Sequence, residues 1–145
     1  MENHGKRIYH DKVSWKKSEV KQSTLNKLFN EIGRIDFFKC DVESYEMNVF
    51  KGAMDFFAEN RPPFVLEICL SDDKVSFFNE FAEKYDYNIY FVSEEGLVRL
   101  DRLYVFDRWP NFLFSQYRSE NNFIPFKDID EFVDSTLSVK LLVHS

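Results

Sequence analysis

The chain has 145 residues, of which 44% are hydrophobic and 18% aromatic, and its formal net charge at pH 7 is −6. This length indicates one domain with a substantial core, built from large aromatic side chains rather than held by disulfides or a metal. The acidic balance argues against nucleic-acid binding, which needs clustered lysine and arginine, and no apolar run is long enough to span a membrane.

The first half of the chain alternates between helical and extended patterns. Residues 1–20 carry little periodicity, so we expect an irregular segment there. A helix is expected next, because apolar side chains recur at helical spacing at Leu25, Leu28, Phe29 and Ile32. Ser23 or Thr24 is suited to begin it and Gly33 to end it. Residues 35–40 then predict a short apolar strand, and residues 49–57 carry a second helical stripe.

The second half opens with an apolar run at 64–70, which is typical of a strand buried on both faces in a parallel sheet. A helix beginning at Asp72 or Asp73 follows. Residues 89–92 and 97–100 predict a β-hairpin, because Gly96 allows the positive φ that such turns use. The remaining expected elements are a short strand at 111–114, a short helix at 128–135 and an apolar terminus at 139–143.

Cysteine and histidine usage limits the chemistry. Cys40 and Cys69 lack the spacing of a metal site or a redox pair, and we expect no signal peptide before them. We therefore expect reduced thiols and a cytoplasmic protein. The three histidines are near the two ends of the chain, which disfavours a histidine base or a metal cluster: His4, His10 and His144. No metal site is expected.

Three carboxylates follow the first predicted strand within six residues, at Asp41, Glu43 and Glu46. Ligands of open α/β sheets bind beyond the carboxyl ends of the strands, so these groups are placed to meet a substrate or cofactor. Asp41 and Glu43 could take a proton, orient an amine or hold a divalent cation. Helix capping and favourable interaction with the helix dipole explain the same acidic residues without chemistry, above all at Glu43 and Glu46.

Glu67 is a lone charge within the apolar run at 64–70. Burying an unpaired carboxylate costs several kcal/mol, so Glu67 must reach solvent, a partner or a site. Lys39, in the strand at 35–40, is more readily explained by solvation than by a Schiff-base or phosphate role. The glycines are too far apart for any phosphate-cradling loop, at Gly5, Gly33, Gly52 and Gly96.

The acidic segment also carries a family resemblance. Residues 35–46 read IDFFKCDVESYE, followed by VFKGA at 49–53 and RPPFVLEI at 61–68. This succession resembles the FkbM family of S-adenosylmethionine-dependent methyltransferases, which typically show D-F-x-K-x-D-x-E-G-x-E, then L-K-G-A, then R-P and a strand ending in glutamate. The resemblance covers about residues 20 to 115. Ser44 stands where the family usually has glycine, and a serine there can instead cap the following helix.

The resemblance implies an α/β fold with part of a Rossmann-like class I methyltransferase sheet. Strands four to seven of that sheet would be 35–40, 64–70, 89–92 with its hairpin partner, and 111–114, with an antiparallel strand near the carboxyl terminus. The glycine-containing cofactor loop of the amino-terminal half has no counterpart in the sequence, so we expect a truncated form. We divide the chain into an irregular segment at 1–20, a methyltransferase-like half-domain at 21–118 and an extension at 119–145.

In a complete enzyme of this type the fourth strand pairs with the first, so the strand at 35–40 would present a bare edge. We expect a partner chain or a homodimer to cover it. The resemblance implies O-methylation of a sugar or other small-molecule hydroxyl by S-adenosylmethionine, with weak or absent cofactor binding by this chain alone.

The same resemblance assigns roles to three carboxylates. Asp41 would lie near the methionine end of the donor or near the acceptor hydroxyl, Glu43 would orient the acceptor, and Glu67 would close the site. Two alternatives remain open, a non-catalytic interaction module and one half of a split methyltransferase.

Overall fold

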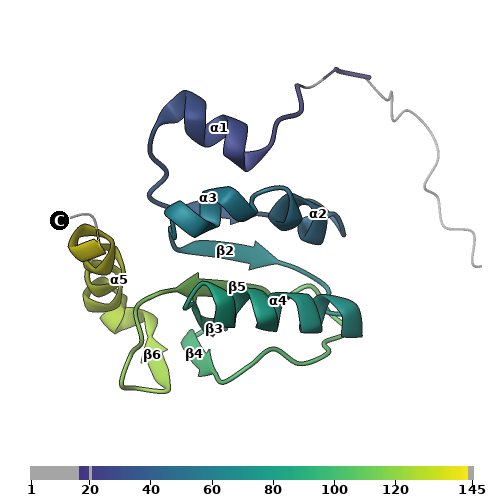
Figure 1. Ribbon diagram of the computed structural model, residues 1–145. Helices are drawn as coiled ribbons and strands as arrows, with labels where there is room; N and C mark the ends of the chain where they lie inside the picture. Colours follow the sequence, from purple (N-terminus) through teal and green to yellow (C-terminus); the bar gives the residue numbers. More distant parts are fainter. Residues whose placement is uncertain (1–16, 20, 144–145) are drawn as a thin grey trace, which may run out of the picture.

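The computed structural model describes residues 17–19 and 21–143, which contain a six-stranded mixed sheet in the order β1-β2-β5-β3-β4-β6 (Figure 1). The strands are β1 (Phe38–Cys40), β2 (Phe64–Glu67), β3 (Asn88–Val92), β4 (Gly96–Leu100), β5 (Asn111–Ser115) and β6 (Phe123–Pro125). β1 and β2 run parallel, whereas all other neighbours in this sheet are antiparallel. The predicted α/β class is therefore confirmed. The irregular segment predicted at 1–20 lies outside the described residues except for 17–19.

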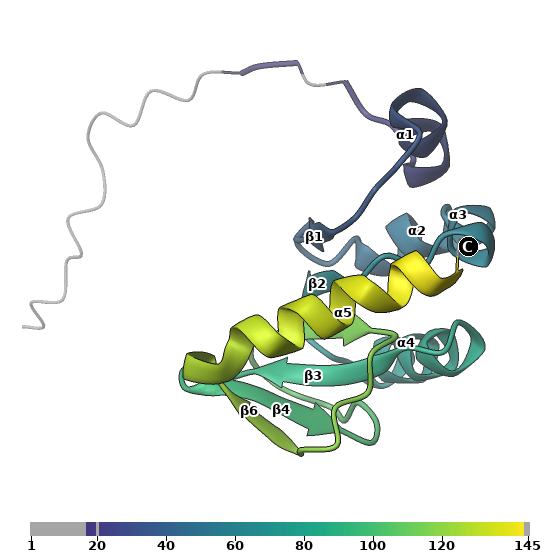
Figure 2. The ribbon, with the colours of Figure 1, turned by 90° about the vertical axis from the view of Figure 1, so that its left-hand side faces the viewer.

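Helices cover both faces of the sheet. They are α1 (Leu25–Ile32), α2 (Glu46–Lys51), α3 (Met54–Glu59), α4 (Asp72–Lys84) and α5 (Ile129–Val143), with a short 3-10 turn at Phe126–Asp128 before α5. The short helices α2 and α3 and the longer α4 pack on one face, and α5 crosses the other (Figures 1 and 2). α1 lies above α3, where the Phe29 ring meets Phe56 edge-on at 5.2 Å.

Alternation along β2 divides the core between these two layers. Phe64 and Leu66 are fully buried on the face of α2, α3 and α4, and the Phe64 ring stacks on Phe114 of β5 at 4.7 Å between centroids. Val65 faces the other way and packs against the cluster beneath α5, which includes Tyr90 and Phe132. Side chains of a strand alternate between faces, so Lys39, which is paired with Val65 in the sheet, belongs to the α5 face.

The first predicted helix is confirmed with both of its ends. The Thr24 side chain accepts a hydrogen bond from the Lys27 amide at 3.2 Å, which satisfies one free N–H of the first turn. Gly33 ends the helix at a φ of 82°, in the left-handed region that glycine enters without steric cost.

Four predicted elements have bounds that differ from the structure. The strand expected at 35–40 is confined to β1, Phe38–Cys40. The stripe at 49–57 forms two short helices because the chain turns at Gly52 and Ala53, which buries both Phe56 and Phe57 of α3. β2 ends at Glu67 rather than continuing to residue 70. The helix expected at 128–135 is α5, which extends to Val143 and includes the predicted apolar terminus. No residue range was predicted for β6, which pairs antiparallel with β4.

The β3–β4 hairpin is confirmed, but the reason for Gly96 differs from the predicted one. Gly96 has no positive φ; a side-chain carbon there would collide with the Ile124 carbonyl and the Pro125 Cα of β6. The glycine is thus required by the close approach of the edge strand β6.

Candidate functional site

The parallel pairing of β1 and β2 brings the predicted acidic residues to one edge of the sheet. Cys40, the last residue of β1, pairs with Leu66, so Asp41 and Glu67 follow at the same level. Glu67 in turn pairs with Asn111, the first residue of β5. The carboxyl ends of β1 and β2 and the amino end of β5 therefore lie together at one end of the strands, which we call the acidic edge. This is where open α/β sheets bind ligands.

Lys39 joins the two carboxylates of this edge. Its Nζ lies 3.0 Å from Oδ2 of Asp41 and 3.2 Å from Oε2 of Glu67. The hydrogen bond to Asp41, followed by that to Glu67, raises the pKa of Lys39, so the ammonium group stays charged. The Asp41 side chain is 45% exposed and that of Glu67 is 29% exposed. Both carboxylates are thus held by one cation and remain open to a ligand.

Glu43 does not join this cluster. It is exposed and has no hydrogen bond or ion pair with another described residue. Its backbone and that of Ser44 have positive φ values of 43° and 77°. The turn after β1 therefore contains two successive left-handed residues, and at Ser44 it has the conformation for which glycine is the preferred residue.

We expect Ser44→Gly to raise the free energy of unfolding by roughly 0.5–1 kcal/mol. Left-handed backbone costs a non-glycine residue about 1–2 kcal/mol, and the greater freedom of glycine in the unfolded chain offsets part of that gain. The Ser44 amide keeps its hydrogen bond to Oε1 of Glu46 in the variant. Urea unfolding measures the change. The same substitution at Ser76, which is exposed within α4, should destabilise instead, because glycine weakens helix interiors.

Among the described residues, Glu46 and not Glu67 is the buried acidic residue, and this was not predicted. Its side chain is fully buried, with Oε1 accepting the Ser44 amide at 2.9 Å and Oε2 lying 3.5 Å from Nζ of Lys74. Oε2 has no hydrogen bond to any described residue. Lys74 belongs to α4, so this ion pair connects the turn after β1, through the start of α2, to the long helix.

Cys40 lies beside this acidic turn, in surroundings that disfavour its thiolate form. Burial of the thiol, followed by the negative charges of Glu46 and Asp41, raises the pKa of Cys40 to about 12. The thiol is therefore neutral at physiological pH, and only thiolates are strong nucleophiles. Cys69 is half-buried, and its Sγ contacts the Phe106 carbonyl at 3.7 Å.

The outer edge of β1 has no strand partner among residues 17–19 and 21–143. A groove of about 840 Å³ lies along it between α1 and α2, lined in part by Leu28, Lys39, Cys40, Val42 and Tyr45. Val42 is 40% exposed and Tyr45 is 55% exposed. Phe37, which precedes the strand, is 52% exposed. The edge that would meet a further strand is thus flanked by exposed apolar side chains.

Metal ligation and membrane spanning have no support within the described part of the chain. No group of three or more histidine, cysteine, aspartate or glutamate side chains is arranged there to hold a metal ion. None of its helices combines the length and the apolar character needed to cross a bilayer.

A mixed α/β sheet with helices on both faces, and with carboxylates at the shared ends of two parallel strands, is consistent with a methyltransferase-like fold. The sequence profile of the methyltransferase FkbM domain matches residues 2–119, most of the chain. The chain therefore belongs to the FkbM methyltransferase family, as its motifs predicted. No curated protein and no solved structure gives a significant match.

Proposed function

We propose that this chain is the carboxyl-terminal half of an S-adenosylmethionine-dependent O-methyltransferase. The observation that carries the proposal is the Lys39 bridge between Asp41 and Glu67 in a chain of the FkbM family. We assign β1, β2, β3 and β5 to the fourth to seventh strands of the class I sheet. Support comes from the spatial order β1-β2-β5-β3, in which β1 and β2 are parallel and β5 is reversed.

The carboxylates of the acidic edge fit the positively charged end of the cofactor. S-adenosylmethionine carries a positive sulfonium and an amino group, and the Asp41 and Glu67 carboxylates offer negative charge partly open to solvent. Its adenosine end has no such match, because the four glycines of the sequence cannot form a nucleotide loop. When bound, the cofactor supplies an electrophilic methyl group.

The chain's own part in the reaction is to position an acceptor and to take its proton. Asp41 would accept the proton of the acceptor hydroxyl, since its carboxylate is exposed at the end of β1. Lys39 would keep Asp41 and Glu67 in place through its two ion pairs. Glu43 would contact the acceptor, as an exposed carboxylate two residues beyond Asp41. We place a sugar or another small-molecule hydroxyl as the acceptor.

A partner chain would supply the missing half of the sheet, or another copy of this chain would cover the outer edge of β1. We place the protein in the cytoplasm. Support comes from the outer edge of β1, which has no strand partner among the described residues, and from the exposed apolar side chains of Phe37, Val42 and Tyr45 beside it. An unpaired, apolar strand edge readily adds another strand. The same edge favours the second candidate function, a non-catalytic interaction module that binds a partner without cofactor.

Calorimetric titration with S-adenosylmethionine tests the proposal. We expect no micromolar binding by the chain alone, and micromolar binding once it is co-expressed with the amino-terminal half of a complete FkbM-family enzyme. Micromolar binding by the chain alone would contradict the division of the pocket between two segments. A co-purified complex that still binds no cofactor would favour the interaction module.

A further inference from the structure

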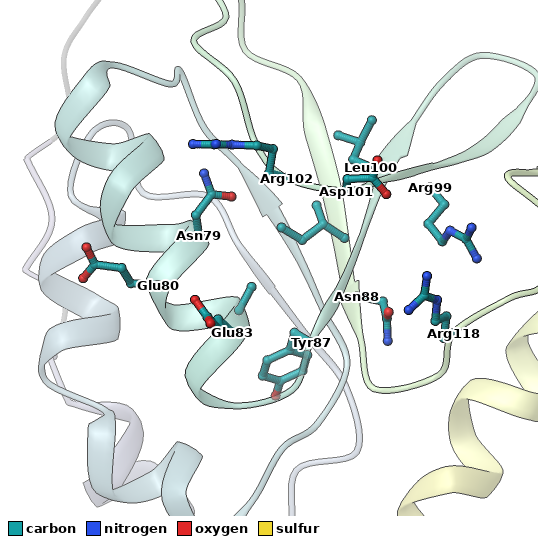
Figure 3. Close-up of a pocket in the computed structure, with 12 residues that line it drawn as sticks. Asn79, Glu80, Glu83, Tyr87, Asn88, Arg99, Leu100, Asp101, Arg102 and Arg118 are labelled. Carbon is teal, nitrogen blue, oxygen red and sulfur yellow. The ribbon is translucent and has the colours of Figure 1, made fainter.

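A second cavity lies at the opposite end of the strands from Asp41 and Glu67. It has a volume of about 470 Å³ and is lined by the end of α4, the start of β3, the end of β4 and the segment after β5 (Figure 3). Asn88, which begins β3, lies in its wall, whereas Val92, which ends β3, pairs with Asn111 of the acidic edge. The length of β3, about 14 Å, therefore separates the two sites.

Three of the seven arginines of this acidic chain line the cavity: Arg99, Arg102 and Arg118. The Arg99 guanidinium donates hydrogen bonds to the Ser119 carbonyl and, at 2.6 Å, to Oδ1 of Asn122. It is thereby fixed beside the backbone of the residue that follows Arg118. Arg118 itself is exposed and has no hydrogen bond or ion pair with another described residue. Two guanidinium groups thus share one wall of the cavity, although like charges repel.

Carboxylates occupy other parts of the same cavity without neutralising these arginines. Glu80 and Glu83 come from α4, and Asp101 follows β4 (Figure 3). None of the three lies within ion-pair distance of Arg99, Arg102 or Arg118 in the described structure. Because these arginines and carboxylates line one cavity without forming ion pairs, a bound molecule could contact both kinds of group.

The chemistry of these groups defines the ligand. Paired guanidinium groups bind phosphate through parallel N–H donors, which arginine presents in a fixed plane. Carboxylates accept hydrogen bonds from hydroxyl groups. The lining also includes the buried hydrophobic residues Ala82, Tyr87 and Ile89, and the volume is within the range of small-molecule sites.

We propose that this cavity binds a small phosphorylated polyol, such as a sugar phosphate, with its phosphate on Arg99 and Arg118 and its hydroxyls toward Glu83 and Asp101. This site is independent of the methyl-transfer edge. It requires neither cofactor nor a completed sheet, so it can be tested on the chain by itself.

NMR titration of the isotopically labelled chain with glucose 6-phosphate tests the proposal. We expect saturable shifts of the Arg118, Ser119 and Asn88 signals below about 10 mM. Inorganic phosphate should bind at least fivefold more weakly, and glucose without phosphate should cause no saturable shift. Arg118→Gln should weaken binding at least fivefold without changing the thermal midpoint, because the side chain is exposed. Arg108→Gln, at an exposed arginine outside the cavity, is the matched control and should leave binding unchanged.

Three outcomes would overturn the proposal. One is the absence of saturable shifts from glucose 6-phosphate. Another is equal weakening by Arg108→Gln and Arg118→Gln, which would indicate unspecific attraction of anions. The third is binding of inorganic phosphate as tight as that of the sugar phosphate, because the carboxylates would then have no part in recognition.

Discussion

Lys74→Met is expected to lower the free energy of unfolding by about 3–5 kcal/mol, because it leaves the buried carboxylate of Glu46 without a cation. Nζ of Lys74 lies 3.5 Å from Oε2 of Glu46, and the side chains are 13% and 0% exposed. Oε2 has no hydrogen bond among the described residues that could replace the ion pair. Urea unfolding measures the loss.

A double variant distinguishes two causes of the expected loss of stability, the unpaired buried charge of Glu46 and the lost packing of the Lys74 side chain. In Glu46→Gln with Lys74→Met, neither charge of this pair remains, and the glutamine oxygen can still accept the hydrogen bond from the Ser44 amide. We therefore expect the double variant to be more stable than Lys74→Met alone. Lys27→Met in α1, at an exposed lysine, is the control and should change stability by less than about 0.5 kcal/mol. A loss below about 1 kcal/mol for Lys74→Met would contradict the argument.

The same ion pair explains why the acidic turn could only partly be predicted. Periodicity placed the strands, and the run at 35–46 placed carboxylates at a strand end, because these signals depend on neighbouring residues. Burial of Glu46 depends on Lys74, which is 28 positions away in another helix. From the sequence, Glu46 was explained by its interaction with the helix dipole, whereas Glu67 was the charge that needed an explanation.

Tertiary contacts also account for the other differences. The break at Gly52 and Ala53 accompanies the burial of Phe57 against β2 and α4 and of Phe56 against Phe29 of α1. Gly96 carries a turn signal in the sequence, yet its role is to let β6 approach. At Ser44 the family pattern has glycine, and the structure shows why. The φ of 77° is a left-handed backbone conformation that glycine adopts without strain.

The bridge at Lys39 was equally hidden in the sequence. The parallel register of β1 and β2 puts Lys39 opposite Val65 and within reach of Glu67. The pattern alone favoured simple solvation for this lysine. The structure instead shows one cation shared by two carboxylates, and this sharing makes Asp41 and Glu67 a single electrostatic unit.

Asp41→Asn is expected to lower kcat of methyl transfer by roughly 10²- to 10⁴-fold in the enzyme assembled with its amino-terminal half, if Asp41 takes the acceptor proton. An amide cannot accept that proton, although it retains the shape of the side chain. The fold should survive, since Asp41 is 45% exposed and an exposed ion pair contributes at most about 1 kcal/mol. Formation of S-adenosylhomocysteine with a sugar hydroxyl acceptor measures the rate.

The division between kcat and KM separates proton transfer from positioning. Loss of a base lowers kcat with little change in KM for the donor, whereas loss of a binding contact raises KM. Glu67→Gln should therefore act mainly on KM, because Glu67 would close the site rather than take the proton. Asp55→Asn, at an exposed position in α3, is the matched control and should leave both constants unchanged. An Asp41→Asn enzyme that retains more than about a third of the original kcat would exclude Asp41 as the base, because general-base catalysis contributes far more than threefold.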